Sequence, residues 1–359
     1  MAELNFTVTD CDGHILESIS EMAEFMEPGP KDHALRSYRN REGVFPSLDG
    51  LHAPNSAIRA GAKKHTRVTA SEFRPGSGED WHAFTEKAGI DKSVLFTSEG
   101  LSVGFIQVPA YAVSICRAYN DYVYERFARL SSRLKPMALI PMQDVPAAVR
   151  ELRRAVKELG FPGAMLPSTG LPLHLGHQLY WPIYEEAEKL DCALAAHGGS
   201  ARGLGLDTFT SMTAAHVLHH PIPLMMALVS FIYDGVFDRF PNLRLGLMEG
   251  GCGWLPCLLD RMKRNEGYYQ HFKGPEHHPV EYVTSGRVLI GVEGSEETLS
   301  YLVKRVGAQV FAYASDYPHE VDFVAAKREI QEMAERSDLT QDEKQAILGG
   351  NAKRFYKLQ

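Results

Sequence analysis

The chain has few cysteines and no pattern that would join them. Five occur in 359 residues, without a C-x-x-C pair or an even, regularly spaced framework. Their scarcity argues against a disulfide scaffold and against a zinc knuckle. We therefore expect reduced thiols in an intracellular protein. The cysteines are Cys11, Cys116, Cys192, Cys252 and Cys257.

The sequence also lacks long apolar runs and an excess of positive charge. No stretch approaches about 18 uninterrupted apolar residues, and the opening MAELNFTVTD carries neither a basic nor an apolar leader segment. The formal net charge is -7, which opposes binding to nucleic acids and to anionic membrane surfaces. We expect a cytoplasmic protein that binds no nucleic acid and no membrane and takes a small-molecule substrate. The sequence does not determine whether the protein forms a homodimer.

What the sequence does contain is a repeated alternation of short apolar, β-branched segments with longer amphipathic ones. Apolar residues recur at helical spacing in 145–160 and 180–191. This alternation predicts βα units and a parallel sheet. Eight strands of this kind close into an α/β fold of the (β/α)8 TIM barrel type, and a doubly wound sheet is the alternative. The predicted strands cover 6–14, 92–98, 135–142, 161–168, 192–199, 243–251, 287–294 and 309–319.

The segment 20–80 interrupts this alternation and is rich in glycine, proline and charge. We interpret it as a long insertion after the first strand that folds over the barrel mouth as a lid, within a single domain spanning 1–359. Its aromatic residues suit an apolar or aromatic substrate, or they simply pack the lid. They are Phe25, Tyr38, Phe45 and Phe73, together with Trp81 directly after the segment.

The first predicted strand ends in a group of polar residues. In TVTDCDGHILE, residues 7–17, the side chains of Asp10, Asp12 and His14 alternate and share one face of an extended chain. Carboxylates and imidazoles crowded on one face are unfavourable unless a cation lies among them, so the pattern predicts a divalent metal. The alternative is a polar strand end whose acids cap the next helix.

Several later strands also end in residues that could ligate a metal. Taken singly, His197 could be a core histidine, Glu249 could accept hydrogen bonds from the GGCGW backbone, and Asp316 could cap a helix. Because the active sites of (β/α)8 barrels lie at the carboxyl ends of the strands, their joint position predicts one metal centre and favours the barrel. The residues are His197, Glu249, Asp316, His319 close after it, and Glu293, which could instead belong to the start of a helix.

The order of these strand ends resembles the amidohydrolase superfamily. The similarity is carried by the D-x-H of Asp12 and His14 and by the motifs AAHGG, FDRFPNLRLGLMEGGCGW and ASDYPH. Within the superfamily the chain is most similar to the branch typified by aminocarboxymuconate-semialdehyde decarboxylase. The resemblance implies a distorted barrel, a bound divalent metal, and either hydrolysis or non-oxidative decarboxylation.

The resemblance also implies roles for single residues. The family's metal ligands correspond to Asp12, His14, His197 and Asp316. Asp12 replaces a first histidine, a change that the branch tolerates. Glu249 replaces a histidine at the end of the sixth strand, an imidazole on which known decarboxylases rely. A carboxylate at this place can ligate a second cation, so we expect one or two ions of Zn, Fe or Mn; the alternative is a structural glutamate at a helix start.

His220 belongs to HVLHHP, residues 216–221, between the fifth and sixth strands. Because the residue before a proline is biased towards extended backbone, we predict that His220 presents its imidazole from a loop to a substrate or a second metal. The alternative is an ordinary surface histidine.

Together these residues favour a metal-dependent hydrolase that acts through metal-activated water on a small, apolar or aromatic amide, ester, thioester or C–C bond. Asp316 would take the proton of the water, while His319 and His220 would hold an oxyanion or a substrate carboxylate. Because Glu249 replaces the histidine that the resemblance implies at the end of the sixth strand, the prediction favours hydrolysis over decarboxylation. The alternatives are a metal-dependent, non-oxidative decarboxylase of an aromatic or unsaturated carboxylic acid, and a non-catalytic ligand-binding barrel.

Overall fold

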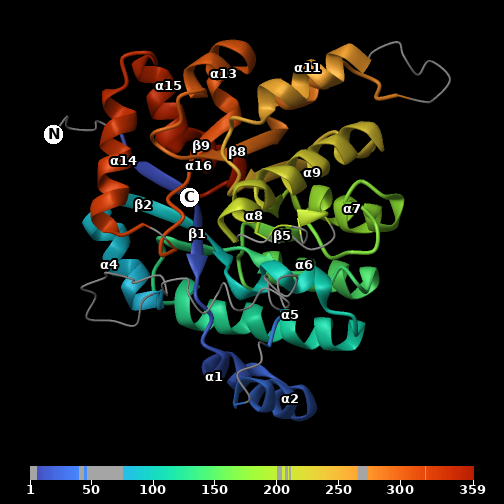
Figure 1. Ribbon diagram of the computed structural model, residues 1–359. Coiled ribbons are helices and arrows are strands. Elements are labelled where there is room, and N and C mark those ends of the chain that lie inside the picture. The colour runs from blue at the N-terminus through green and yellow to red at the C-terminus, as the bar shows by residue number, and fades with distance from the viewer. Residues whose placement is uncertain are drawn as a thin grey trace.

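The computed structural model describes residues 6–39, 44–46, 76–199, 204–206, 209, 212–265, 274–319 and 321–359. Its strands form the centre and its helices the outside of the molecule (Figure 1). The strands are β1 (Val8–Ile15), β2 (Ile90–Thr97), β3 (Leu134–Pro136), β4 (Ala138–Leu139), β5 (Gly163–Pro167), β6 (Ala193–His197), β7 (Arg244–Met248), β8 (Val288–Val292) and β9 (Phe311–Tyr313).

The α-helices follow the strands along the chain, and short 3-10 or π segments extend several of them. They are α1 (Ile19–Met22), α2 (Pro28–Arg39), α4 (Gly78–Ala88), α5 (Pro109–Val123), α6 (Val145–Lys157), α7 (Trp181–Leu190), α8 (Met212–His219), α9 (Pro221–Tyr233), α10 (Val236–Arg239), α11 (Leu255–Asn265), α12 (Pro279–Tyr282), α13 (Leu299–Val306), α14 (Phe323–Glu335), α15 (Gln341–Gln345) and α16 (Asn351–Tyr356).

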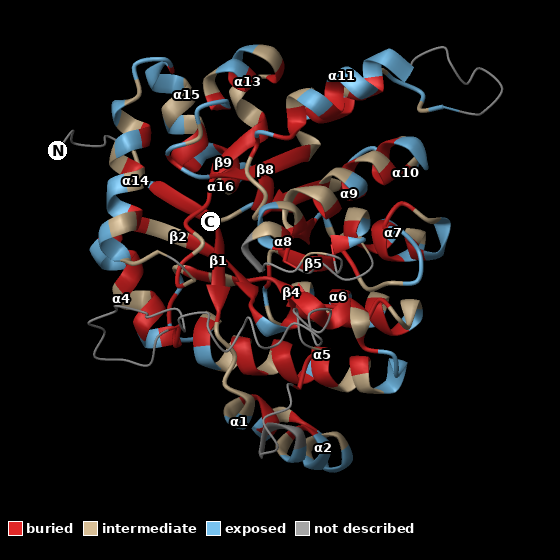
Figure 2. Ribbon diagram, in the orientation of Figure 1, coloured by how far each residue is buried: buried red, intermediate tan, exposed pale blue. Residues whose placement is uncertain are grey.

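The strands pair in parallel and in the order of the chain, which identifies a (β/α)8 TIM barrel. One run of pairs joins β1, β2 and β3, and a second runs from β4 to β9. A doubly wound sheet would reverse its strand order at a switch point, and the observed order does not. The strands are almost entirely buried beneath the helices, as Figure 2 shows.

The predicted third strand, 135–142, is divided between the two sheets. Its first part, β3, pairs with β2, and its later part, β4, pairs with β5. Met137 lies between β3 and β4. The Met137 N–H still donates to the carbonyl of Leu95 at 2.8 Å. A change of sheet partner within three residues leaves no periodic signal in the sequence, because both halves stay buried and apolar.

The last strand returns to the first through its carboxyl end. The backbone N–H groups of Ser315 and Asp316 donate to the carbonyl of Asp12 at 3.2 and 2.9 Å. Asp10 strengthens this seam, since its carboxylate accepts the N–H and the hydroxyl of Ser315, both at 2.9 Å. Asp10 therefore ties β1 to the segment after β9 rather than joining its neighbours at the strand end.

The predicted lid lies only partly within the described residues. Helices α1 and α2 lie beyond the carboxyl end of β1 and pack against α5 (Figure 1). Residues 40–43 and 47–75, which hold most of the predicted lid and its Phe73, lie outside the described part of the chain. Its closure over the mouth stays a prediction.

Apolar length alone marks one stretch as able to span a membrane. Ala214–Tyr233 has a mean hydropathy of 1.4, and half of it is buried inside the fold. It comprises α9 and most of α8, and α9 packs against β6. The core helix of a soluble protein has the same composition, so this stretch is weak evidence for a membrane span.

Trp81, predicted as a lid aromatic, is instead a core residue beneath β1. Its side chain is fully buried, and its indole N–H donates to the carbonyl of His14 at 3.0 Å. The ring lies against Gly13, where an added Cβ would be 2.2 Å from the nearest ring carbon. Glycine is therefore required between Asp12 and His14, because a side chain at this position would overlap the indole ring.

We predict that Gly13→Ala destabilises the protein by about 1–3 kcal/mol, because the new methyl group must displace the buried Trp81 ring. Denaturant unfolding measures the change. The matched control is Gly29→Ala in α2, where an added Cβ meets nothing within 4 Å and stability should stay within about 0.5 kcal/mol. Equal stability of both variants would contradict the packing argument.

Candidate active site

The carboxyl ends of four strands bring acidic and imidazole side chains to one place. Two overlapping groups have ligand atoms that all lie within 4.8 Å of one another. The first group is buried and the second is partly exposed, so the site opens to solvent on the side of β7 and β9. The first contains Asp12, His14 and His197, and the second contains His14, Glu249, Asp316 and His319.

His14 lies at the centre of both groups and presents one bare nitrogen. Its Nδ1 donates to the carbonyl of Thr97 at 3.0 Å, so its Nε2 carries the lone pair. This Nε2 lies 3.4 Å from Asp316 Oδ1, 3.7 Å from Asp12 Oδ1 and 3.8 Å from Glu249 Oε2. The atom is buried and has no hydrogen-bond partner among the described residues. A buried acceptor surrounded by carboxylates calls for a cation.

His197 is oriented in the same way. Its Nδ1 donates to the carbonyl of Gly198 at 2.9 Å, and its Nε2 lies 3.1 Å from Asp12 Oδ1. A backbone carbonyl that fixes one ring nitrogen while the other nitrogen faces a carboxylate at the centre of the group is the arrangement typical of metal-binding histidines. The alternative of an isolated core histidine does not fit, since the ring faces a carboxylate.

Glu249 and Asp316 share an uncommon backbone conformation. Both have left-handed φ values, 58° and 53°, directly after β7 and close after β9. Such values cost energy for residues other than glycine and cluster at functional sites. Other residues fill the structural roles that were the alternatives for Glu249 and Asp316. Glu296 accepts a hydrogen bond from the Cys252 N–H at 2.7 Å, and Asp322 caps α14.

Glu293 is the strand-end acid that does not join the site. Its side chain is exposed, and it belongs to neither group of candidate ligands. Its backbone N–H donates to Glu296 at 3.1 Å, which places it in the turn before α13.

His319 connects the second group to β2. Its Nδ1 lies 2.9 Å from Asp316 Oδ1, and its Nε2 lies 3.0 Å from the hydroxyl of Ser98. The ring also stacks on His14 with centroids 4.1 Å apart. Asp316 and His319 are 24 % and 25 % exposed, so a substrate can reach both. Ser98 was missed from the sequence, because a lone serine after a strand carries no signal.

The backbone prediction for His220 is wrong, although its imidazole does reach the site. The residue is helical (φ −84°, ψ −57°) and joins α8 to α9 without a loop. Pro221 is accommodated because it occupies the first turn of α9, where its missing N–H costs no helical hydrogen bond. The imidazole Nδ1 of His220 lies 3.5 Å from Glu249 Oε2. His220 thus approaches the group through Glu249.

Burial sets the protonation of these side chains. Burial, reinforced by nearby His319 and His197, lowers the pKa of His14 well below its ordinary value, and burial lowers the pKa of His220 to about 2. Both rings are therefore neutral. Burial also disfavours the charged form of His197, but the Asp12 carboxylate outweighs it and raises the pKa of His197, while burial raises the pKa of Asp12.

The donor set fits a divalent cation. Two imidazole nitrogens with fixed tautomers and carboxylates on either side suit Zn, Fe or Mn. Asp12, His14, His197 and Asp316 are the residues that would hold it, with Glu249 adjacent.

Comparison with known proteins gives consistent matches over most of the chain. The family described as amidohydrolase matches residues 9–358. A 2-amino-3-carboxymuconate-6-semialdehyde decarboxylase from Dictyostelium discoideum is 28% identical over 272 residues, 75% of this chain and 73% of the relative. A gamma-resorcylate decarboxylase from Polaromonas sp. is 27% identical over 296 residues, 76% of this chain and 85% of the relative.

A solved structure shows the same fold. The dihydroxybenzoic acid decarboxylase of Polaromonas sp., with bound manganese and the inhibitor 2-nitroresorcinol, superimposes with a TM-score of 0.69 at 21% identity. The match covers 98% of this chain and 97% of that protein.

We predict that His197→Ala weakens metal binding at least about tenfold, because the remaining ligands cannot replace a buried, oriented imidazole. Elemental analysis after dialysis against a fixed metal concentration measures the effect. The exposed His277→Ala variant is the control and should keep the metal content of the parent. An unchanged metal content in His197→Ala would remove this residue from the centre.

Proposed function

The chain belongs to the amidohydrolase family, and from this membership we propose that it is a metal-dependent decarboxylase, one that removes CO₂ from an aromatic or unsaturated carboxylic acid. The sequence alone favoured hydrolysis, with decarboxylation as an alternative. The relatives reverse that order of preference, since both curated relatives described above are decarboxylases.

The observation that carries the proposal is the bare Nε2 of His14 among the carboxylates of Asp12, Glu249 and Asp316. When bound there, a divalent cation supplies the positive charge that holds a substrate carboxylate and a neighbouring hydroxyl or carbonyl oxygen. Manganese is the metal we propose to test first, because the Polaromonas structure contains it.

The replacement of the strand 6 histidine by Glu249 is compatible with this chemistry. The imidazole of His220 lies 3.5 Å from the Glu249 carboxylate, and the imidazole of His319 lies 3.9 Å from it. The imidazole of His220, between α8 and α9, and that of His319, after β9, therefore flank the position where the resemblance implied one. The absence of a histidine at position 249 is therefore a weaker argument against decarboxylation.

The pair of Asp316 and His319 is suited to deliver the proton. In decarboxylation the bond between the ring carbon and the carboxylate breaks, CO₂ leaves, and the electron pair left on carbon takes a proton. The two side chains share a 2.9 Å contact and are partly exposed, so a proton held between them can be renewed from solvent. Ser98 orients the outer nitrogen of His319.

Hydrolysis is the second candidate, and one observation favours it. Glu249 and Asp316 place two partly exposed carboxylates on the open side of the site, and either can accept a proton from water. The chemistry of the substrate, rather than the shape of the barrel, distinguishes the two reactions.

We predict CO₂ release from at least one member of a panel of hydroxybenzoates by the manganese-loaded protein, and no release after chelation of the metal. The same preparation is assayed for hydrolysis of thioesters, amides and vinylogous diketones. Hydrolysis of any of these without CO₂ release from the panel would reject the decarboxylase and support the second candidate.

We further predict that Asp316→Asn lowers kcat by at least about 10², because asparagine keeps the shape but cannot hold the proton. The measurement compares kcat at equal metal loading, from pH 5 to 9. Asp322→Asn, which alters only the N-cap of α14, serves as the control and should keep kcat. A near-normal kcat in Asp316→Asn would transfer the proton step to His319 or Glu249.

A further inference from the structure

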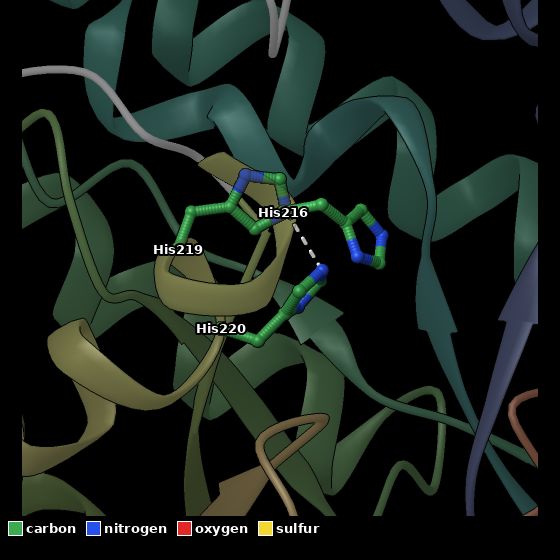
Figure 3. Close-up of side chains that lie close together, drawn as sticks. All are labelled: His216, His219 and His220. Atoms are coloured by element: carbon green, nitrogen blue, oxygen red, sulfur yellow. Dashed lines mark hydrogen bonds between the residues drawn. The ribbon is translucent and has the colours of Figure 1, made fainter. Parts of the chain in front are cut away.

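Three histidines gather beside the candidate active site on a single helical face. His216 and His219 belong to α8, and His220 continues its helical backbone. The spacing i, i+3, i+4 brings the three side chains to one side of the helix. Figure 3 shows the three imidazoles turned towards one another.

The distances between these rings suit joint ligation of one ion. One nitrogen from each ring lies within 4.8 Å of the others, and the Nε2 atoms of His219 and His220 are 2.8 Å apart. Ring centroids are 4.2 to 4.8 Å apart. His219 is buried while His216 is exposed, so the cluster has a closed base and an open side through which an ion can enter.

His220 is held against the barrel in a way that leaves its Nε2 facing the other two histidines. A Cβ on Gly198 would lie 2.9 Å from both the Cα and the Nδ1 of His220, so this glycine allows the close approach. The Nδ1 faces Glu249 Oε2 at 3.5 Å. A carboxylate behind one ring nitrogen and a ligand position at the other is the arrangement that orients metal-binding histidines.

The all-imidazole donor set favours a different metal from the site at the strand ends. Imidazole nitrogens suit Zn, Cu and Ni, whereas sites rich in carboxylate accept Mn, and Mn²⁺ has the lowest affinity of the series for a given nitrogen site. The candidate active site mixes imidazoles with carboxylates, and the histidine cluster contains no carboxylate.

We propose that His216, His219 and His220 form a second metal site, which binds Zn²⁺ at the rim of the candidate active site. Glu249 lies between the two sites, because its Oε2 faces His220 on one side and His14 and His197 on the other. The proposal does not depend on the reaction that the enzyme catalyses.

The test counts metal ions in the full-length protein. Manganese-loaded protein is titrated with Zn²⁺ near neutral pH, binding is followed by calorimetry, and zinc plus manganese per chain are then measured by elemental analysis. We expect a total of two ions per chain in the parent. His216→Ala and His219→Ala should each bind the rim ion at least about tenfold more weakly and reduce the total to one. His277→Ala, at an exposed histidine outside the cluster, should keep two.

The total count remains valid if Zn²⁺ replaces manganese at the strand ends, because either metal counts as one ion there. His197→Ala should show the opposite pattern and keep only the rim ion, so failure of one site is distinguishable from failure of the other. A parent total of one, or a total of two retained in both His216→Ala and His219→Ala, would overturn the proposal and leave the 2.8 Å contact as a plain histidine–histidine hydrogen bond.

Discussion

The concentration of carboxylates around the bare nitrogen of His14 is the constraint on which the rest of the site depends. Asp12 and His14 are almost completely buried, and Glu249 and Asp316 lie within 4 Å of the same nitrogen. Like charges at such distances in a medium of low polarity destabilise the fold unless a cation balances them. The fold therefore has to hold these groups together against their own repulsion, and its other features are explained by that requirement.

The barrel meets this requirement with contacts close to the strand ends. Glu249 and Asp316 keep left-handed backbone conformations, which aim their carboxylates inward at a cost in energy. The buried Asp10 joins β1 to Ser315 and so secures the segment that carries Asp316. Burial raises the pKa of Asp10 to about 7, even though the hydrogen bonds from Ser315 oppose that change. Trp81 packs against Gly13 and donates its indole N–H to the carbonyl of His14, which anchors the end of β1.

Glu249 stands where the resemblance to the amidohydrolase superfamily implies a histidine. Its carboxylate is close to His14, His197 and His220 and so faces both the strand ends and the histidine cluster on α8. An imidazole at its position would add a neutral ligand or a proton donor. A carboxylate adds negative charge, which favours a cation nearby and leaves proton transfer to the imidazoles beside it.

Most of the barrel and its strand-end residues could be predicted from the sequence, because buried parallel strands are apolar throughout and the polar residues at their ends interrupt that pattern. The sequence alone thus determined the fold class and brought Asp12, His14, His197, Glu249, Asp316 and His319 forward as one group. It also ranked Glu293 below Glu249, because the residues after Glu293 are typical of a helix start, and in the structure the left-handed turn at Glu249 carries its side chain inward.

Other features were decided by tertiary structure alone. The bias of a residue before proline is local and weak, and at His220 the packing of α8 and α9 against the barrel overrides it. The contact of Trp81 with Gly13 and the hydrogen bond between Ser98 and His319 join residues whose positions depend on separate elements. A sequence pattern records which residues can share a face of one element. Which faces meet is settled only when the elements pack, because the free energy of packing depends on the shapes of both partners.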